Sequence, residues 1–164
     1  MLITQPRTPA LRTAFPLLRP LPLRRADCDP AGYLDPACGA VLCDGALRQW
    51  LAEGGFCPRG SAAPMPVCAE SAFRRHADLA FPGPVEIGMR VARVALSSVR
   101  WDVALFAPDA PEAALEGRIV QVFLHPETRR PMPVAAALRT ALAGLGAPGG
   151  GALAETQSTT PLPG

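Results

Sequence analysis

Two stretches in the second half of the chain alternate apolar and polar side chains at every second position. Residues 85–91 show this pattern, and residues 98–105 repeat it after the short link Leu96-Ser97. A period of two is typical of a strand buried on one face, so the stretches predict an antiparallel pair joined by a turn. The phase slips around Ala92-Arg93, which predicts a β-bulge there.

Other stretches are predicted to complete the sheet and its surroundings. Residues 17–25 read as a first strand interrupted by proline, which places this strand at a sheet edge. Residues 67–76 and 112–124 are strand candidates on either side of the alternating pair. A short helix is predicted from about residue 134 to 142, after the prolines at 131 and 133.

A long amphipathic helix is predicted between the first strand and the others. Asp35-Pro36 is typical of a helix start, because aspartate can cap free N–H groups and proline suits the first helical position. Gly54-Gly55 is typical of a helix end. The predicted apolar stripe consists of Ala37, Ala40, Val41, Leu47 and Leu51. Asp44 falls on the same stripe, where a carboxylate needs a partner or a chemical role.

The order of these elements predicts an α+β fold. Because the helix has a broad apolar face and one sheet to bury it, we expect a curved antiparallel sheet of about five strands wrapped round the helix. We expect this domain at residues 16–145, between a flexible segment at 1–15 and a disordered tail at 146–164. A second copy of the chain can cover an open sheet edge.

Composition excludes several classes of function. The 164 residues are 49% hydrophobic and 18% charged, which suits one domain with a core. The net charge of +2 is too small to indicate a nucleic-acid partner. No apolar stretch is long enough to predict a membrane span. The five cysteines form no CxxC pair, so we expect no metal site. Their odd number, without a secretory signal, predicts reduced thiols and a cytoplasmic location.

An acidic turn just ahead of the long helix carries the candidate chemistry. It reads Asp27-Cys28-Asp29-Pro30-Ala31-Gly32. A carboxylate there can reach an electrophile held at the helix N-terminus, where free N–H groups and the helix dipole favour negative charge. This arrangement suits hydrolysis of an activated carbonyl. A structural turn is the simpler interpretation of the same residues.

The chain resembles the hotdog-fold acyl-CoA thioesterases of the 4-hydroxybenzoyl-CoA thioesterase type over residues 17–143. The resemblance is carried, in this order, by the acidic turn and by the segments at 79–85, 93–100 and 127–133. It implies the hotdog fold and hydrolysis of an acyl-CoA thioester to a free acid and CoA. It also implies a homodimer or homotetramer with sites at the dimer interface, and no cofactor beyond the CoA of the substrate.

The same resemblance implies roles for individual side chains. Asp29 is the catalytic carboxylate, acting as base or nucleophile on the thioester. Asp27 orients Asp29 or the turn, and Asp44 is a supporting acid on the helix. Substrate-binding positions are Gly32, Tyr33, Ser97 and Ser98.

Backbone N–H groups at the helix start are expected to polarise the thioester carbonyl, at Pro36, Ala37 and Cys38. Relatives commonly read Gly-His-Val-Asn-Asn where this chain has Gly32-Tyr33-Leu34-Asp35-Pro36. Proline has no N–H, so Ala37 and Cys38 are the remaining donors.

Functions of different classes therefore stay open. The retained Asp29 favours a thioesterase, whereas the altered stretch at 32–36 favours a hotdog dimer that binds acyl-CoA or an acyl ligand without efficient turnover. A subunit that only completes its partner's pocket is a further alternative. Asp29 can also be a structural turn residue, and Asp44 a helix acid bound by a neighbour.

Overall fold

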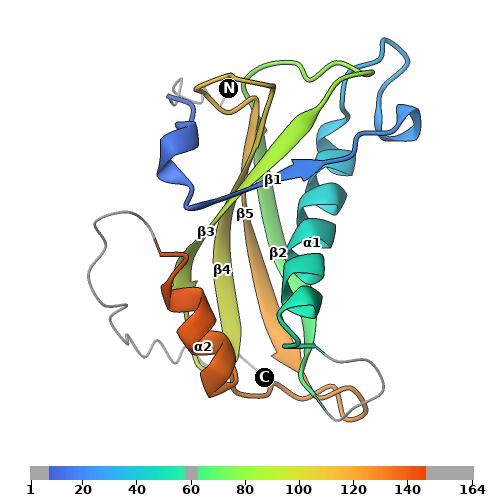
Figure 1. Ribbon diagram of the computed structural model, residues 1–164. Coiled ribbons are helices and arrows are strands. Elements are labelled where there is room, and N and C mark those ends of the chain that lie inside the picture. Colours follow the sequence, from blue (N-terminus) through green and yellow to red (C-terminus); the bar gives the residue numbers. More distant parts are fainter. Residues whose placement is uncertain (1–7, 58–62, 147–164) are drawn as a thin grey trace, which may run out of the picture.

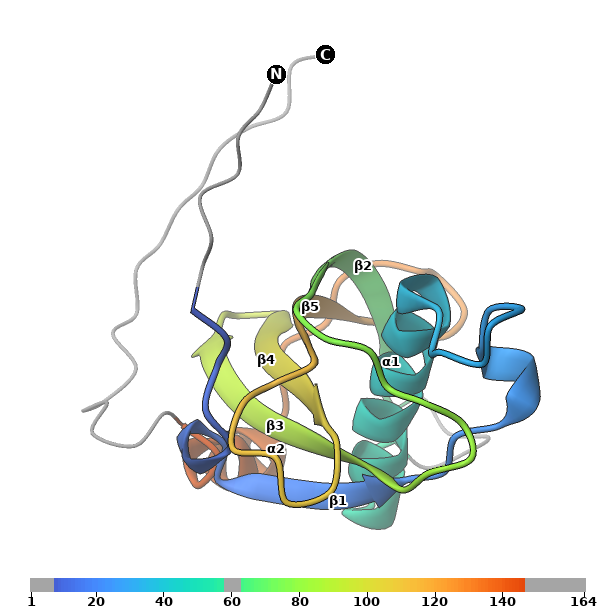
Figure 2. The same cartoon turned by 90° about the horizontal axis from the view of Figure 1, so that it is seen from above.

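The computed structural model describes residues 8–57 and 63–146, and it confirms the expected architecture. An antiparallel five-stranded sheet in the order β1-β3-β4-β5-β2 curves round the long helix α1 (Figures 1 and 2). The strands are β1 (Leu17–Leu21), β2 (Met65–Arg75), β3 (Val85–Val94), β4 (Ser98–Phe106) and β5 (Leu115–Leu124). The helices are α1 (Pro36–Glu53), α2 (Ala136–Ala143) and the single 3-10 turns η1 (Arg12–Ala14) and η2 (Arg25–Asp27).

Helix α1 begins and ends where the sequence predicts. Asp35 is the N-cap, Pro36 is the first helical residue, and Gly54 is the C-cap. The buried face differs from the predicted stripe, because it consists of residues four apart: Gly39, Cys43, Leu47 and Leu51. Val41 is 73% exposed, since it lies two residues, or about 200°, round the helix from Gly39.

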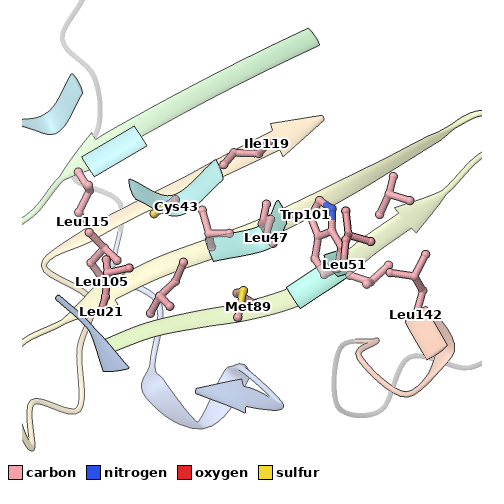
Figure 3. Close-up of a cluster of buried hydrophobic side chains, with 14 of the residues drawn as sticks. Leu21, Cys43, Leu47, Leu51, Met89, Trp101, Leu105, Leu115, Ile119 and Leu142 are labelled. Atoms are coloured by element: carbon pink, nitrogen blue, oxygen red, sulfur yellow. The ribbon is translucent and has the colours of Figure 1, made fainter. Parts of the chain in front are cut away.

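The main core fills the space between α1 and the concave face of the sheet (Figure 3). Leu47, Leu51 and Trp101 are fully buried, and Trp101 makes an edge-to-face contact with Trp50 at 5.6 Å between ring centroids. Leu138 and Leu142 of α2 belong to the same cluster. Burial of this apolar surface is the main force that holds the sheet round the helix.

The bulge and the edge strand are where the sequence predicts them, but β1 and β5 are shorter than predicted. The predicted bulge is present as a register shift between Val91 and Arg93. The predicted edge position of β1 is also confirmed, because β1 pairs with β3 alone. The first strand ends at Leu21 rather than at residue 25, and β5 begins at Leu115 rather than at 112.

Residues 10–15, predicted to belong to a flexible segment, pack on the convex face of the sheet. The N–H of Ala113 donates to the carbonyl of Ala10 at 2.9 Å. Phe15 is 5% exposed and meets Phe106 edge to face, in a second small apolar cluster. Burial of this aromatic ring is the physical reason that the segment is held. The predictions for residues 1–7 and 147–164 lie outside the described residues.

Candidate functional site

The acidic turn is closed on itself by backbone hydrogen bonds. The N–H of Asp29 donates to the carbonyl of Tyr33 at 2.8 Å, and the N–H of Gly32 donates to the carbonyl of Asp29 at 3.0 Å. Gly32 has φ of +93°, a conformation that glycine adopts without the steric cost of a Cβ. The segment at 79–85 holds the turn from outside, because the N–H of Phe81 donates to the carbonyl of Gly32 at 2.9 Å.

Asp29 is a half-buried residue whose carboxylate is held on one side. Its Oδ1 accepts the N–H of Tyr33 at 3.0 Å, so Asp29 and Tyr33 bond each other twice. No residue in 8–57 or 63–146 donates to Oδ2. The guanidinium of Arg25 donates to the carbonyls of Asp29 and Pro30, at 2.7 and 3.0 Å, and brings a positive charge to the turn. A carboxylate with one fixed and one available oxygen can act as a base or nucleophile.

Asp27 plays a different part from its neighbour. It is only 5% exposed, and both of its oxygens accept hydrogen bonds from Arg24. The side-chain hydrogen bond from Arg24 holds the pKa of Asp27 below its ordinary value. The carbonyl of Asp27 accepts the N–H of Asp35 at 3.1 Å. Asp27 therefore fixes the turn to the residue that caps α1, and its carboxylate is engaged by Arg24.

The start of α1 has fewer free backbone N–H groups than the first turn of a helix usually leaves unpaired. The Asp35 carboxylate accepts the N–H of Ala37 at 2.7 Å, which is an N-cap hydrogen bond. Pro36 has no N–H, and the N–H of Gly39 donates to the carbonyl of Asp35 at 2.8 Å. Of the predicted positions Pro36, Ala37 and Cys38, Cys38 is the one whose N–H is not used by the cap.

Asp44 belongs to a hydrogen-bond chain that crosses the core. The fully buried amide of Gln121 donates to Asp44 Oδ1 at 3.0 Å, and its oxygen accepts Trp101 Nε1–H at 3.1 Å. Arg48, one helical turn along, donates to Asp44 Oδ2 at 2.7 Å. Asp44 is thus satisfied within its own chain. It lies about 10 Å along the helix axis from Ala37, at 1.5 Å per residue.

Ser97 and Ser98 lie at the far end of the same protomer. Leu105 packs near Gly39 at the start of α1, whereas Trp101 packs on Trp50 near the helix end. β4 continues in that direction to Ser98, so the serines are on the order of 20 Å from the start of α1. Figure 1 shows the connection between β3 and β4 beside α2, at the opposite end from the start of α1.

Three solved structures show which proteins share this arrangement. The PA5185 protein from Pseudomonas aeruginosa strain PAO1 is 33% identical with a TM-score of 0.80, and the match covers 86% of this chain and 98% of that chain. A thioesterase from Thermus thermophilus, solved with coenzyme A and Zn, is 24% identical over 80% of this chain and 95% of its own, with a TM-score of 0.63. Slr0204 from Synechocystis, a 1,4-dihydroxy-2-naphthoyl-CoA thioesterase, is 14% identical over 77% and 94%, with a TM-score of 0.65.

The chain has the hotdog fold and is similar to the PA5185 protein over most of the length of both chains. No protein-family model matches its sequence, and no curated protein does. At 24% and 14% identity, the likeness of this hotdog protein to the two thioesterases concerns the fold.

Among the described residues, this hotdog protein has no group of three or more metal-ligating side chains that could hold an ion. Its thiols are free within the same ranges, and Cys43 is fully buried in the core. Burial raises the pKa of the Cys43 thiol far above its ordinary value, so this cysteine is a packing residue. None of the helices in the described part of the chain combines the length and apolar character that a bilayer crossing requires.

The partners of the candidate acids Asp27 and Asp44 were not predicted from the sequence. Gln121 stands between Ile119 and Phe123 on the inward phase of β5, so the period-two pattern could have placed this polar side chain in the core. Arg48 follows Asp44 by four residues, a spacing at which helical side chains meet. Arg24 has no such signal, because its contact with Asp27 depends on the 3-10 turn η2.

Proposed function

We propose that this protein hydrolyses an acyl-CoA thioester to the free acid and CoA, with Asp29 as base or nucleophile. One observation carries the proposal: the carboxylate of the half-buried residue Asp29, fixed through Oδ1 by the N–H of Tyr33, stands on the turn that leads into α1. The helix dipole favours the developing negative charge on a carbonyl oxygen at that position. The hotdog fold, which this chain shares with solved thioesterases, supports the same reaction class. The 4-hydroxybenzoyl-CoA thioesterase type stays a prediction.

Two routes are compatible with this geometry. In the nucleophilic route, the Asp29 carboxylate adds to the carbonyl, the C–S bond breaks, and CoA leaves as a thiolate. Water then hydrolyses the acyl anhydride that has formed on Asp29. In the base route, Asp29 accepts a proton from a water molecule whose oxygen adds to the carbonyl, and the departing thiolate takes up a proton. In both routes the Cys38 N–H is the proposed donor to the carbonyl oxygen.

We propose that a second copy completes the site, as a homodimer or homotetramer. Within one protomer Ser97 and Ser98 lie at the far end from Asp29, so their predicted role at the acyl-CoA site requires the same residues of another copy. The edge strand β2 supports such an assembly, because it pairs with β5 alone and Ala69–Ala72 is exposed. Gly32 and Tyr33 are proposed to contact the substrate beside Asp29.

The proposed reaction needs no cofactor, since coenzyme A enters as part of the substrate. The Thermus thermophilus relative was solved with coenzyme A bound, which supports a CoA thioester as the substrate class. Free thiols among the described residues support the proposed cytoplasmic location.

A panel of acyl-CoA thioesters with thiol release as the readout tests the proposal. Wild type should release CoA from at least one thioester, and Asp29→Asn should lose most of kcat, because an amide is neither a base nor a nucleophile here. Asp109→Asn is the matched control, since Asp109 is exposed on the turn between β4 and β5 and its positive φ suits asparagine. Equal activity of Asp29→Asn and wild type would refute the assignment of Asp29.

A second function is favoured by a separate observation. The N–H of Ala37 donates to the Asp35 carboxylate, and Pro36 has no N–H. The start of α1 therefore has fewer free N–H donors to polarise a thioester carbonyl. This supports a hotdog dimer that binds acyl-CoA or an acyl ligand without efficient turnover. In that case thiol release stays at background for the whole panel, while CoA thioesters raise the melting temperature of the wild type.

A further inference from the structure

A hollow of about 480 Å³ opens on the convex face of the sheet, the face away from α1. It is lined by side chains from β2, β3, β4 and β5 and by residues 8, 10 and 15 of the N-terminal segment. Its volume lies within the range of small-molecule sites. None of the residues proposed for thioester hydrolysis lines it.

Four arginines line this hollow: Arg74, Arg90, Arg100 and Arg118. The strand register explains their convergence. Arg90, Asp102 and Arg118 lie directly opposite one another on β3, β4 and β5. Because side chains alternate between the two faces of a sheet, all three point to the convex face. Arg100 is the next outward position along β4.

The two carboxylates in the lining are already engaged. Asp102 accepts from Arg90 Nε at 3.1 Å and from Nη2 at 3.0 Å. Glu116 accepts the N–H of Ala10 through Oε2 at 2.9 Å, and its Oε1 lies 3.2 Å from His76 Nε2. Asp102 is paired with Arg90, whereas Glu116 is held by a backbone N–H that carries no net charge. The lining therefore still has two more guanidinium groups than carboxylates.

Arg74 and Arg100 have no carboxylate within ion-pair distance among the residues that the structure describes. Within residues 8–57 and 63–146, Arg118 pairs with Glu70 alone, at 3.1 Å, and both side chains of this pair are about half exposed. Such an exposed pair is weak and exchanges readily for a stronger acceptor. The hollow therefore presents up to three guanidinium groups to a ligand, with four cations and two carboxylates in its lining.

We propose that this hollow is a binding site for a small molecule that carries phosphate groups. Guanidinium groups bind phosphate through paired, charge-assisted hydrogen bonds, and several of them directed at one concave space favour a multiply charged anion. Phe15 gives the same space an apolar wall, which suits an organic part of the ligand. The inference is independent of the proposed thioester hydrolysis.

Calorimetric titration of the full chain with pyrophosphate tests the site. Wild type should bind saturably, and Arg74→Ala and Arg100→Ala should each weaken binding about ten-fold. Neither variant leaves a described carboxylate without its partner, so the fold should be retained, which circular dichroism checks. Arg130→Ala is the matched control, because Arg130 is exposed on the turn after β5 and its replacement removes the same charge. It should change the affinity by less than about two-fold.

Competition identifies the source of the phosphate. If CoA displaces pyrophosphate, the groups recognised are those of CoA, and if it does not, another phosphorylated compound is the ligand. Absence of saturable binding, or an equal loss in all three variants, overturns the proposal. Light scattering tests whether a second copy of the chain occupies the hollow instead. If the protein assembles without pyrophosphate and Arg100→Ala dissociates the assembly, this face is a contact between copies. That result would also overturn the proposal.

Discussion

The carboxylate of Asp35 accepts the backbone N–H of Ala37 at 2.7 Å, at the point where α1 begins. The same hydrogen bond that stabilises the helix therefore uses one of the donors expected to polarise a thioester carbonyl. Asp35 also adds a negative charge where the proposed reaction develops one. The residues that cap α1 therefore oppose the proposed reaction at the helix start.

Replacing Asp35 should expose that conflict in kinetics. Asp35→Ala frees the N–H of Ala37, and a donor to the developing oxyanion is worth about 10²-fold or more in kcat, so we expect a clear rise in thiol release. Loss of the cap should cost about 1 kcal/mol in the free energy of unfolding. Asp35→Asn keeps an acceptor and removes the charge, so its kcat should lie between the two. A lower kcat in both variants would mean that Asp35 assists the reaction.

Removing the buried amide of Gln121 should destabilise the protein. In Gln121→Leu the buried Nε1–H of Trp101 loses its acceptor and Asp44 loses a donor. We expect a loss of about 1 to 3 kcal/mol in the free energy of unfolding, measured by urea denaturation.

Gln49→Leu is the control for this change. Gln49 lies on the exposed side of α1 and bonds only Glu53 there, so the effect should stay within about 0.5 kcal/mol. A double variant of Gln121 and Asp44 should be non-additive by about 0.5 kcal/mol or more. Additive losses would show that the hydrogen bond between them contributes nothing.

The pair of Arg24 and Asp27 should make stability depend on acid pH. Because the pKa of Asp27 is lowered in the folded state, its ionised form stabilises the fold above the unfolded-state pKa of about 3.9. That contribution is lost as the pH falls through the lowered folded-state pKa. The difference in free energy of unfolding between wild type and Asp27→Asn should therefore be constant at neutral pH and shrink below about pH 4.

Asp78→Asn serves as the comparison for the acid titration. Asp78 pairs with Arg75 at the surface, where ion pairs contribute little, so its difference from wild type should be small at every pH. If Asp27→Asn followed the same flat profile, the pair of Arg24 and Asp27 would not be a source of acid sensitivity.

Two glycines of α1 should respond oppositely to alanine. A Cβ at Gly39 would lie 2.5 Å from the buried Leu115 side chain, so Gly39→Ala should destabilise the fold by about 1 kcal/mol after the gain in helix propensity. At Gly45 a Cβ meets nothing within 4 Å, and Gly45→Ala should stabilise by about 0.5 to 1 kcal/mol. Thermal melts of the two variants check this, and a stabilised Gly39→Ala would contradict the close packing of α1 on the sheet.

Local signals in the sequence determined the elements and the two ends of α1. The Asp35-Pro36 start, the Gly54 end, the period of two in β3 and β4, and the slip at the bulge all depend on residues that are close along the chain. Backbone preferences and side-chain alternation act over such short distances, which is why these features could be predicted. The acidic turn was predictable for the same reason.

Tertiary structure decided which atoms of the candidate site are free. That Asp27 is held by Arg24, that Gln121 reaches Asp44, and that Ser97 lies far from Asp29 depend on the three-dimensional fold and the register of strands distant in sequence. The arginines of the convex hollow likewise converge only when β2 to β5 pair in this order. A sequence pattern specifies which face a side chain takes, whereas long-range packing specifies what it meets there.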